Sequence, residues 1–228
     1  MKPCIVNVSC DHWYPRGQDR LKASLGKVGY DGETLFFRNK FPTNSPPHAK
    51  VPYAFKIYAI MEAINRGHKL LLWCDSSMVA VANPAPLFYK IEESGHFFVS
   101  EAQKLGNWST DAFLKHWGLT RDEAMEIPLF SAGFTGLNID NPRSKEFLDT
   151  WLKASQDGVS FIGPWGRSES ISLDERCKGH RHDMSAGSLI AHKLNMELQS
   201  THSGFIRGEI ENIPADKRDG IYFEAHGM

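Results

Sequence analysis

The sequence predicts a single-domain α/β fold whose mixed, mainly parallel sheet is flanked by helices. The run 70–74 is apolar without alternation, which is typical of a strand buried on both faces. Segments with strand and helix patterns alternate along the chain, which indicates successive βαβ units. Because 228 residues are enough for one sizeable core, we expect one domain over residues 1–228.

The N-terminal third supplies the first units of this fold. A β-branched run predicts the first strand, and Leu21 and Leu25 have the spacing of a helix. Tyr53, Ile57 and Ile60 mark the clearest helix, which leads directly into the strand that ends at Asp75. The predicted elements are strand 4–8, helix 16–25, strand 34–37, a proline-rich connection 41–52 and helix 53–66.

The remaining elements carry more turn and capping signals. Thr120 and Glu123 form a capping box, and Asn141 before Pro142 is a good helix start. The predicted elements are helix 87–93, strand 97–99, strand 129–139, helix 143–154 and helix 184–194. Between the last two helices the periodicity vanishes over 155–179, and loops of this length are often binding loops.

Composition excludes several classes of function. The formal net charge of −1 provides no bulk positive field, so we expect neither nucleic acid nor an anionic membrane as a partner. The four cysteines show no metal-ligand spacing, and Cys74 lies in the buried strand, which is typical of reduced thiols. The first residues resemble neither a secretory signal nor a spanning helix, so we expect a cytoplasmic protein without a membrane span.

Candidate binding residues lie where the buried strand ends. In open α/β sheets ligands bind beyond the carboxyl ends of strands, so Asp75 should lie at a crevice beside small Ser76 and Ser77. A solvated Asp that starts a turn is the alternative. Gly133 and Gly136 weaken a strand unless a ligand or another segment of the protein approaches its backbone, and both explanations remain open.

Four blocks of the sequence have a recognisable order. They are the aromatic-rich loop 11–17, Asp75-Ser76-Ser77 after an apolar strand, the glycine-bearing strand 130–138 and the helix start 182–185. Over most of residues 1–200 this order resembles the nucleotide-sugar-dependent glycosyltransferases of the GT-A fold. The pattern is most similar to retaining enzymes related to glycogenin and the bacterial lipopolysaccharide galactosyltransferases. Their corresponding blocks are a D-x-D motif, an N-A-G-V-x-x-x-N block and an aspartate-glutamine helix start.

The resemblance implies a nucleoside diphosphate sugar as donor and a glycan or other hydroxyl compound as acceptor. Lys56 matches a basic residue that contacts the donor phosphate, Arg16 and Arg20 lie near the nucleotide loop, and Tyr14 or Trp13 is a candidate to stack on the base. Solvated surface charges are the alternative for the three cations. The predicted donor-binding residues are Tyr14, Arg16, Lys56, Asp75, Ser76, Ser77, Gly133 and Gly136.

The metal site implied by the resemblance is incomplete. The second aspartate of D-x-D ligates a divalent metal in that family, and Ser77 stands in its place. Hard cations require several oxygen ligands, so dependence on Mn²⁺ or Mg²⁺ is in doubt. The family's C-terminal H-x-x-G-x-x-K-P-W segment has no clean counterpart; His202 or His226 is the candidate for its histidine. Asp75 and His226 are the predicted metal ligands.

Asp183 has two interpretations, which can both hold. It precedes a helix and can serve as its N-cap, or its carboxylate can orient the acceptor hydroxyl and accept a proton. We predict Asp183 and Asp75 as catalytic residues, and Trp165 and His182 as acceptor-binding residues. Trp165 lies in the loop 155–179, which we predict on the acceptor side; anchoring that loop is the alternative for its indole.

The sequence therefore favours a glycosyltransferase. A non-catalytic protein that binds nucleotide sugars or glycans on the same fold is the main alternative, because Ser77 replaces a metal carboxylate. A metal-dependent hydrolase that uses His180, His182, Asp183 and Asp75 is a third possibility. It leaves the strand and glycine blocks unexplained.

Overall fold

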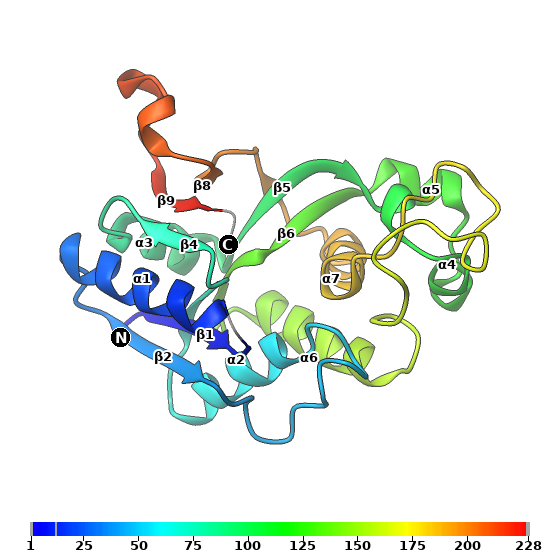
Figure 1. Cartoon of the computed structure of the whole chain (residues 1–228), viewed down its shortest axis with the longest axis horizontal. Helices are drawn as coiled ribbons and strands as arrows, with labels where there is room; N and C mark the ends of the chain where they lie inside the picture. The colour runs from blue at the N-terminus through cyan, green and yellow to red at the C-terminus, as the bar shows by residue number, and fades with distance from the viewer. Residues whose placement is uncertain (1, 12, 227–228) are drawn as a thin grey trace.

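The computed structural model describes residues 2–11 and 13–226 and has a central six-stranded sheet, in the order β2-β1-β3-β6-β5-β7 (Figure 1). Its first half is parallel: β1 (Cys4–Ser9) lies between β2 (Glu33–Arg38) and β3 (Leu70–Cys74). Every residue of β1 and β3 is buried, as the unalternating apolar runs predict.

The second half of the sheet is mostly antiparallel. β6 (Pro128–Asn138) runs antiparallel to both β3 and β5 (His96–Lys104), and the two-residue β7 (Leu198–Gln199) pairs in parallel with β5. Three of the five strand pairs are parallel, so the predicted mixed, mainly parallel sheet is confirmed.

Helices cover both faces of this sheet (Figure 1). The predicted helices are present, with boundaries that differ by one to a few residues at each end. The helices are α1 (Tyr14–Lys27), α2 (Phe55–Asn65), α3 (Ala85–Ser94), α4 (Asp111–Trp117), α5 (Arg121–Glu126), α6 (Pro142–Gln156) and α7 (His182–Lys193), together with 3-10 turns Leu105–Trp108, Ile210–Asn212 and Ala215–Lys217.

The sheet separates two hydrophobic cores because successive side chains of a strand point to opposite faces. In β1, Val6 packs in the core formed with α2, α6 and α7, whereas Ile5 packs in the core formed with α1 and α3. In β3, Trp73 likewise packs in the core with α2, α6 and α7, and Leu72 packs in the core with α1 and α3. Because both faces of the sheet are packed, the carboxyl ends of β1 and β3 are fixed at the same edge of the sheet.

β5 and β6 extend together beyond the other strands as a long ribbon toward α4 and α5 (Figure 1). The capping box of Thr120 and Glu123 opens α5, and Asn141 caps α6, as predicted. The chain between Gln156 and His182 contains no helix or strand among its described residues, which agrees with the predicted loop.

A second sheet, of three short strands, was not predicted from the sequence. β4 (Met78–Ala80) pairs antiparallel with β9 (Ile221–Ala225), which pairs in parallel with β8 (Gly204–Arg207). This small sheet closes the core around Phe134 and brings the C-terminal segment to the turn that follows β3. Strands of three to five residues carry too few positions for an alternation to be recognised.

The start of α2 is also different from the prediction. Tyr53 is not a helical residue: its φ is 62°, its backbone N–H donates to His48 Nδ1 at 3.0 Å, and the helix begins at Phe55. The Tyr53 ring therefore faces the rim of the sheet rather than the core.

Two further expectations concern the chain as a whole. All four cysteines carry free thiols, and three of them are buried. Within the described residues, no helix combines the length and apolar character needed to cross a bilayer.

Candidate functional site

A cavity of about 560 Å³ opens at the carboxyl ends of β1 and β3 and continues under the β5–β6 ribbon. Its volume is within the range of small-molecule sites. It is lined by Val8, Cys10, Asp11, Tyr14, Phe41, His48, Tyr53, Phe55, Lys56, Trp73, Asp75, Ser76, Ser77, Met78, Glu101, Gln103, Leu129, Ser131, Ala132, Gly133, Trp165, Arg181, Asp183, Met184 and Arg207.

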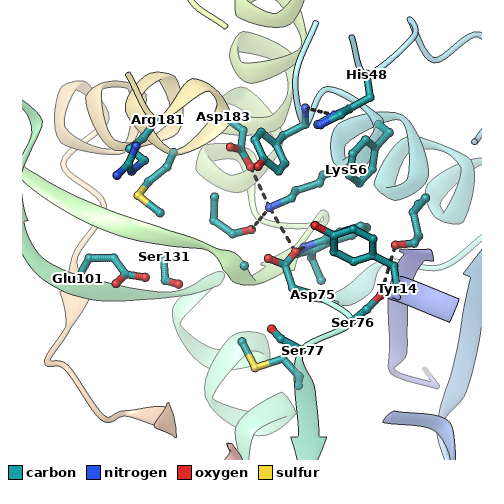
Figure 2. Close-up of a pocket in the computed structure, with 18 of the residues that line it drawn as sticks. Tyr14, His48, Lys56, Asp75, Ser76, Ser77, Glu101, Ser131, Arg181 and Asp183 are labelled. Atoms are coloured by element: carbon teal, nitrogen blue, oxygen red, sulfur yellow. Dashed lines mark hydrogen bonds and ion pairs between the residues drawn. The ribbon is translucent and has the colours of Figure 1, made fainter. Parts of the chain in front are cut away.

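Three charged side chains form the centre of this cavity. Lys56 Nζ lies 3.2 Å from Asp75 Oδ1 and 3.0 Å from Asp183 Oδ2, and it donates to the carbonyl of Ala132 at 3.2 Å. Figure 2 shows the lysine side chain running between the two carboxylates. The contact with the Ala132 carbonyl is a hydrogen bond, and the contacts with the two carboxylates are ion pairs. Lys56 therefore positions the carboxylates, and its contact with a donor phosphate stays a prediction.

Asp75 is the exposed member of the triad. Its side chain is 39% exposed, whereas those of Lys56 and Asp183 are 5% exposed. Oδ1 also accepts a hydrogen bond from Trp73 Nε1 at 2.8 Å, so that Oδ2 is the oxygen available to a ligand. The predicted place of Asp75 at a crevice is confirmed.

Asp183 is not a helix N-cap. The N-cap position of α7 is Arg181, and Asp183 lies within the first turn without a side-chain capping bond. Its carboxylate points into the cavity toward Lys56 (Figure 2). Lys56 binds Oδ2, which leaves Oδ1 for a ligand.

The protonation equilibria of the triad are coupled. Burial acts against the Lys56 ammonium, but the charges of Asp183 and Asp75 outweigh it and raise the Lys56 pKa. Burial raises the pKa of Asp183, and the charge of Lys56 opposes this rise. One ammonium between two carboxylates gives the ionised triad a net charge of −1, a negative centre in a largely enclosed site.

A buried polar network holds the turn after β3. Asn7 Nδ2 donates to the Cys74 carbonyl at 2.7 Å and to Ser76 Oγ at 3.1 Å, and Gln18 Nε2 donates to Asn7 Oδ1 at 2.7 Å. The Ser76 hydroxyl is therefore directed into the protein, and its residue lines the cavity with its remaining atoms. A buried, fully bonded network of this kind fixes one geometry of the turn.

The two glycines of β6 have different surroundings. A Cβ at Gly133 would lie 2.8 Å from Asp75 Oδ2, inside the cavity. A Cβ at Gly136 would lie 2.7 Å from Ile91 of α3, in the core on the other face. Residues three apart in a strand point to opposite faces, so the structure places only Gly133 at the site, and the predicted donor-binding role of Gly136 is not supported.

This difference yields a paired prediction. Gly133→Ala should displace the Asp75 carboxylate and impair ligand binding, with little loss of thermal stability. Gly136→Ala should lower the midpoint of thermal unfolding instead, because overpacking a core costs about 1–3 kcal/mol. Thermal unfolding in the absence and presence of nucleotide measures both effects. An unchanged ligand response in Gly133→Ala would show that nothing binds beside Asp75.

Aromatic side chains form the wall beside Asp183. The Arg181 guanidinium lies 3.5 Å from the ring centre of Trp108 and 3.8 Å from that of Trp165, so it is stacked between two indoles. Trp165 is 54% exposed, and its ring also lies 6.1 Å from that of Tyr53. Trp165 is therefore both anchored through Arg181 and exposed at the cavity, which combines the two interpretations of its indole.

The first rim loop contributes to the opposite side of the cavity. Tyr14 lines it next to Asp11, and Figure 2 shows Tyr14 beside Asp75 and Ser76. Arg16 is exposed and lies over the Trp13 ring rather than in the cavity, so its predicted contact with a donor is not supported. His12 of this loop lies outside the described residues.

The two histidines before α7 do not converge on a metal position. His180 is fully buried and its Nε2 contacts the Ser160 carbonyl, while His182 Nδ1 contacts the Phe161 carbonyl. Burial lowers the pKa of His180 to about 4, so the ring is neutral at pH 7. His182 is buried beside the Tyr53 and Trp165 rings and does not line the cavity, contrary to its predicted contact with an acceptor. The hydrolase interpretation therefore loses its histidine ligands.

The side chains around Asp75 and His226 also fit a divalent cation poorly. Asp75 Oδ1 is bound by Trp73 and Lys56, and a lysine ammonium 3.2 Å away repels a second cation. The His226 N–H donates to the Ser77 carbonyl at 3.0 Å, so the backbone brings the predicted ligands close together, but His226 Nε2 contacts Glu224 at 2.7 Å. In residues 2–11 and 13–226 no three His, Cys, Asp or Glu side chains are arranged to hold a metal ion, and His202 does not line the cavity.

Several lining residues were missed in the sequence. Glu101 and Gln103 lie near the end of β5, past register shifts in its pairing with β6. His48 lies in the proline-rich connection, and Arg207 lies in the unpredicted β8. Asn7, which holds the turn after β3, was also missed, although a polar residue in the middle of an otherwise apolar strand is a detectable signal.

Comparison with solved structures identifies similar folds. A glycosyltransferase involved in glycosylation of the major capsid of PBCV-1 aligns with a TM-score of 0.53 at 12% identity, over 98% of this chain and 93% of that chain. Mouse xyloside xylosyltransferase 1 aligns with a TM-score of 0.54 at 10% identity, over 99% and 97%. The bifunctional glycosyltransferase WbbM aligns with a TM-score of 0.54 at 12% identity, over 98% of this chain but 45% of WbbM.

At sequence level no protein-family model and no curated protein matches the chain. The structural matches, at 10–12% identity, are evidence for the fold alone. The central mixed sheet, its flanking helices and the alignment over nearly the whole chain agree with the resemblance seen in the sequence. The chain has the GT-A-type glycosyltransferase fold.

Proposed function

We propose that this protein is a glycosyltransferase that moves a sugar from a nucleoside diphosphate donor to a hydroxyl acceptor. The observation that carries the proposal is the Asp75–Lys56–Asp183 triad at the centre of a cavity of about 560 Å³. Two carboxylates from distant parts of the chain are fixed by one buried lysine, at the rim where α/β folds bind ligands.

The triad suits the charge that develops in sugar transfer. The bond between the anomeric carbon and the diphosphate oxygen breaks, its electron pair leaves with the diphosphate, and the sugar becomes oxocarbenium-like. A fixed centre with a net charge of −1 stabilises that cation. The acceptor oxygen then bonds to the anomeric carbon, and its proton passes to Asp183, whose pKa burial has raised.

The two ends of the cavity suit two different ligands. Tyr14, Asp11 and the turn of Ser76 and Ser77 form one end, where a nucleotide and its diphosphate would lie. Trp165 and Arg181 form the other end, where an exposed indole offers a platform for an acceptor sugar. The triad lies between these two ends (Figure 2).

Nucleotide binding is the first expected result. A panel of UDP, GDP, CDP and dTDP should include a ligand that raises the midpoint of thermal unfolding, because binding to the native state adds stability. A concentration 100 times the dissociation constant adds about 2.7 kcal/mol. If no nucleotide in the panel produces a shift, with or without Mn²⁺, the donor site is not where we place it.

A non-catalytic nucleotide-sugar-binding protein is the second candidate, favoured by Ser77 at the position of a metal carboxylate. It predicts the same thermal shift without release of the nucleoside diphosphate from any donor sugar. Following diphosphate release from the matching nucleotide sugars, with and without simple glycan acceptors, distinguishes the two functions.

A further inference from the structure

Two arginines lie near Ser77 on the side of the cavity away from Asp183. Arg20 Nη2 donates to the Ser77 carbonyl at 3.3 Å, and the backbone N–H of His226 donates to the same oxygen at 3.0 Å. Arg207 lines the cavity together with Ser77, and both residues also line an adjoining groove. These residues come from three distant parts of the sequence.

The small sheet accounts for this convergence. Met78 of β4 is paired with Ala225 of β9, and Ala225 is paired with Arg207 of β8. Ser77 precedes β4 and His226 follows β9, so the antiparallel pairing places both residues at the same end of the small sheet. The register therefore holds Arg207 at a fixed place across from the turn that follows β3, independently of loop conformation.

The Arg207 guanidinium has N–H groups available to bind a ligand. Its side chain is 64% exposed and forms an ion pair with Glu101, which is 10% exposed. A guanidinium has five N–H donors in a planar fork and binds phosphate oxygens bidentately, so the pair with Glu101 does not exhaust it. Lys56, by contrast, is buried in contact with Asp75, Asp183 and the Ala132 carbonyl, and Arg181 is stacked between two indoles.

We propose that Arg207 binds the donor diphosphate around Ser77 and takes the place of a divalent cation, so that the site works without a metal. The inference rests on the proposed function. As the bond to the anomeric carbon breaks, the electron pair moves onto the diphosphate oxygen, and the Arg207 guanidinium neutralises the added negative charge. The surroundings of Asp75 fit a metal ion poorly, and Arg207 supplies positive charge near Ser77 instead.

The test measures thermal shifts for UDP, GDP, CDP and dTDP in EDTA, in Mg²⁺ and in Mn²⁺. We expect the nucleotide that binds to give the same shift in all three conditions. Arg207→Ala should weaken its binding at least tenfold in EDTA, and Arg207→Lys should retain part of it. Arg143→Ala, which removes an exposed arginine far from the cavity lining, is the matched control and should bind as the wild type does.

Two further variants separate charge from structure. Arg207→Ala also releases the Glu101 carboxylate, so Glu101→Gln is measured alongside it and should bind at least as tightly as the wild type. Ser77→Asp should lose binding in EDTA, because its carboxylate repels the diphosphate. Midpoints without nucleotide report whether each variant is folded.

The outcomes distinguish this inference from the function on which it rests. A shift that requires Mn²⁺ or Mg²⁺, with Arg207→Ala equal to the wild type, would overturn the metal-free site and leave the glycosyltransferase proposal standing. No shift with any nucleotide in any condition would overturn both.

Discussion

Lys56→Met should lower the free energy of unfolding by about 3–5 kcal/mol, the cost of removing one partner from a buried ion pair. Lys56 and Asp183 are both 5% exposed, so the substitution leaves a buried carboxylate without its counter-charge. Methionine keeps most of the side-chain volume, so the loss reports charge rather than packing. Urea denaturation measures it.

Two controls make this prediction specific. Lys145→Met removes an exposed lysine that pairs with Asp149 one turn further along α6, and such pairs contribute only about 0.3–0.5 kcal/mol. The double variant Lys56→Met/Asp183→Asn should recover part of the loss, because it removes the orphaned charge together with its partner. Equal losses in Lys56→Met and Lys145→Met would contradict the buried triad.

The sequence predicts the three charged residues at the centre of the site, but not how they contact one another. Asp75 is predicted because it follows a buried strand, at the edge where α/β sheets bind ligands, whereas Lys56 and the role of Asp183 in the site are predicted from the resemblance to GT-A enzymes. Their mutual arrangement was not predicted, since ion pairs between residues as distant as 56 and 183 depend on tertiary packing. The ion pairs of Lys56 add a positioning role to the phosphate contact that the resemblance implies.

Where the sequence failed, the cause is local geometry. Gly136 was grouped with Gly133 as though a strand had one face, although a separation of three residues reverses the side. Arg207 and the strands β4, β8 and β9 carry no usable period because they are short. His182 looked available beside Asp183, but its φ of 47° turns the chain so that the ring is buried under Tyr53 and Trp165.

The different surroundings of Asp75 and Asp183 predict different roles for the two carboxylates. Both carboxylates contact Lys56, but Asp75 is 39% exposed beside Ser76 and Ser77, whereas Asp183 is nearly buried beside the Trp165 and Arg181 wall. Under the proposed function, Asp75 would therefore bind the donor and Asp183 would act on the acceptor. Asp75→Asn should mainly weaken nucleotide binding, while substitution of Asp183 should leave binding nearly intact.

Asp183→Asn should reduce turnover by about 100-fold or more, the contribution typical of a positioned general base. Asparagine preserves the shape and the first turn of α7, but it can neither accept a proton nor supply negative charge next to the developing sugar cation. Release of nucleoside diphosphate from the donor sugar is the measured rate, and the nucleotide-induced thermal shift shows that the donor still binds. Asp149→Asn, on the exposed face of α6, is the control and should turn over as the wild type does. Full activity in Asp183→Asn would remove this carboxylate from the chemistry and leave it only as the partner that keeps Lys56 buried.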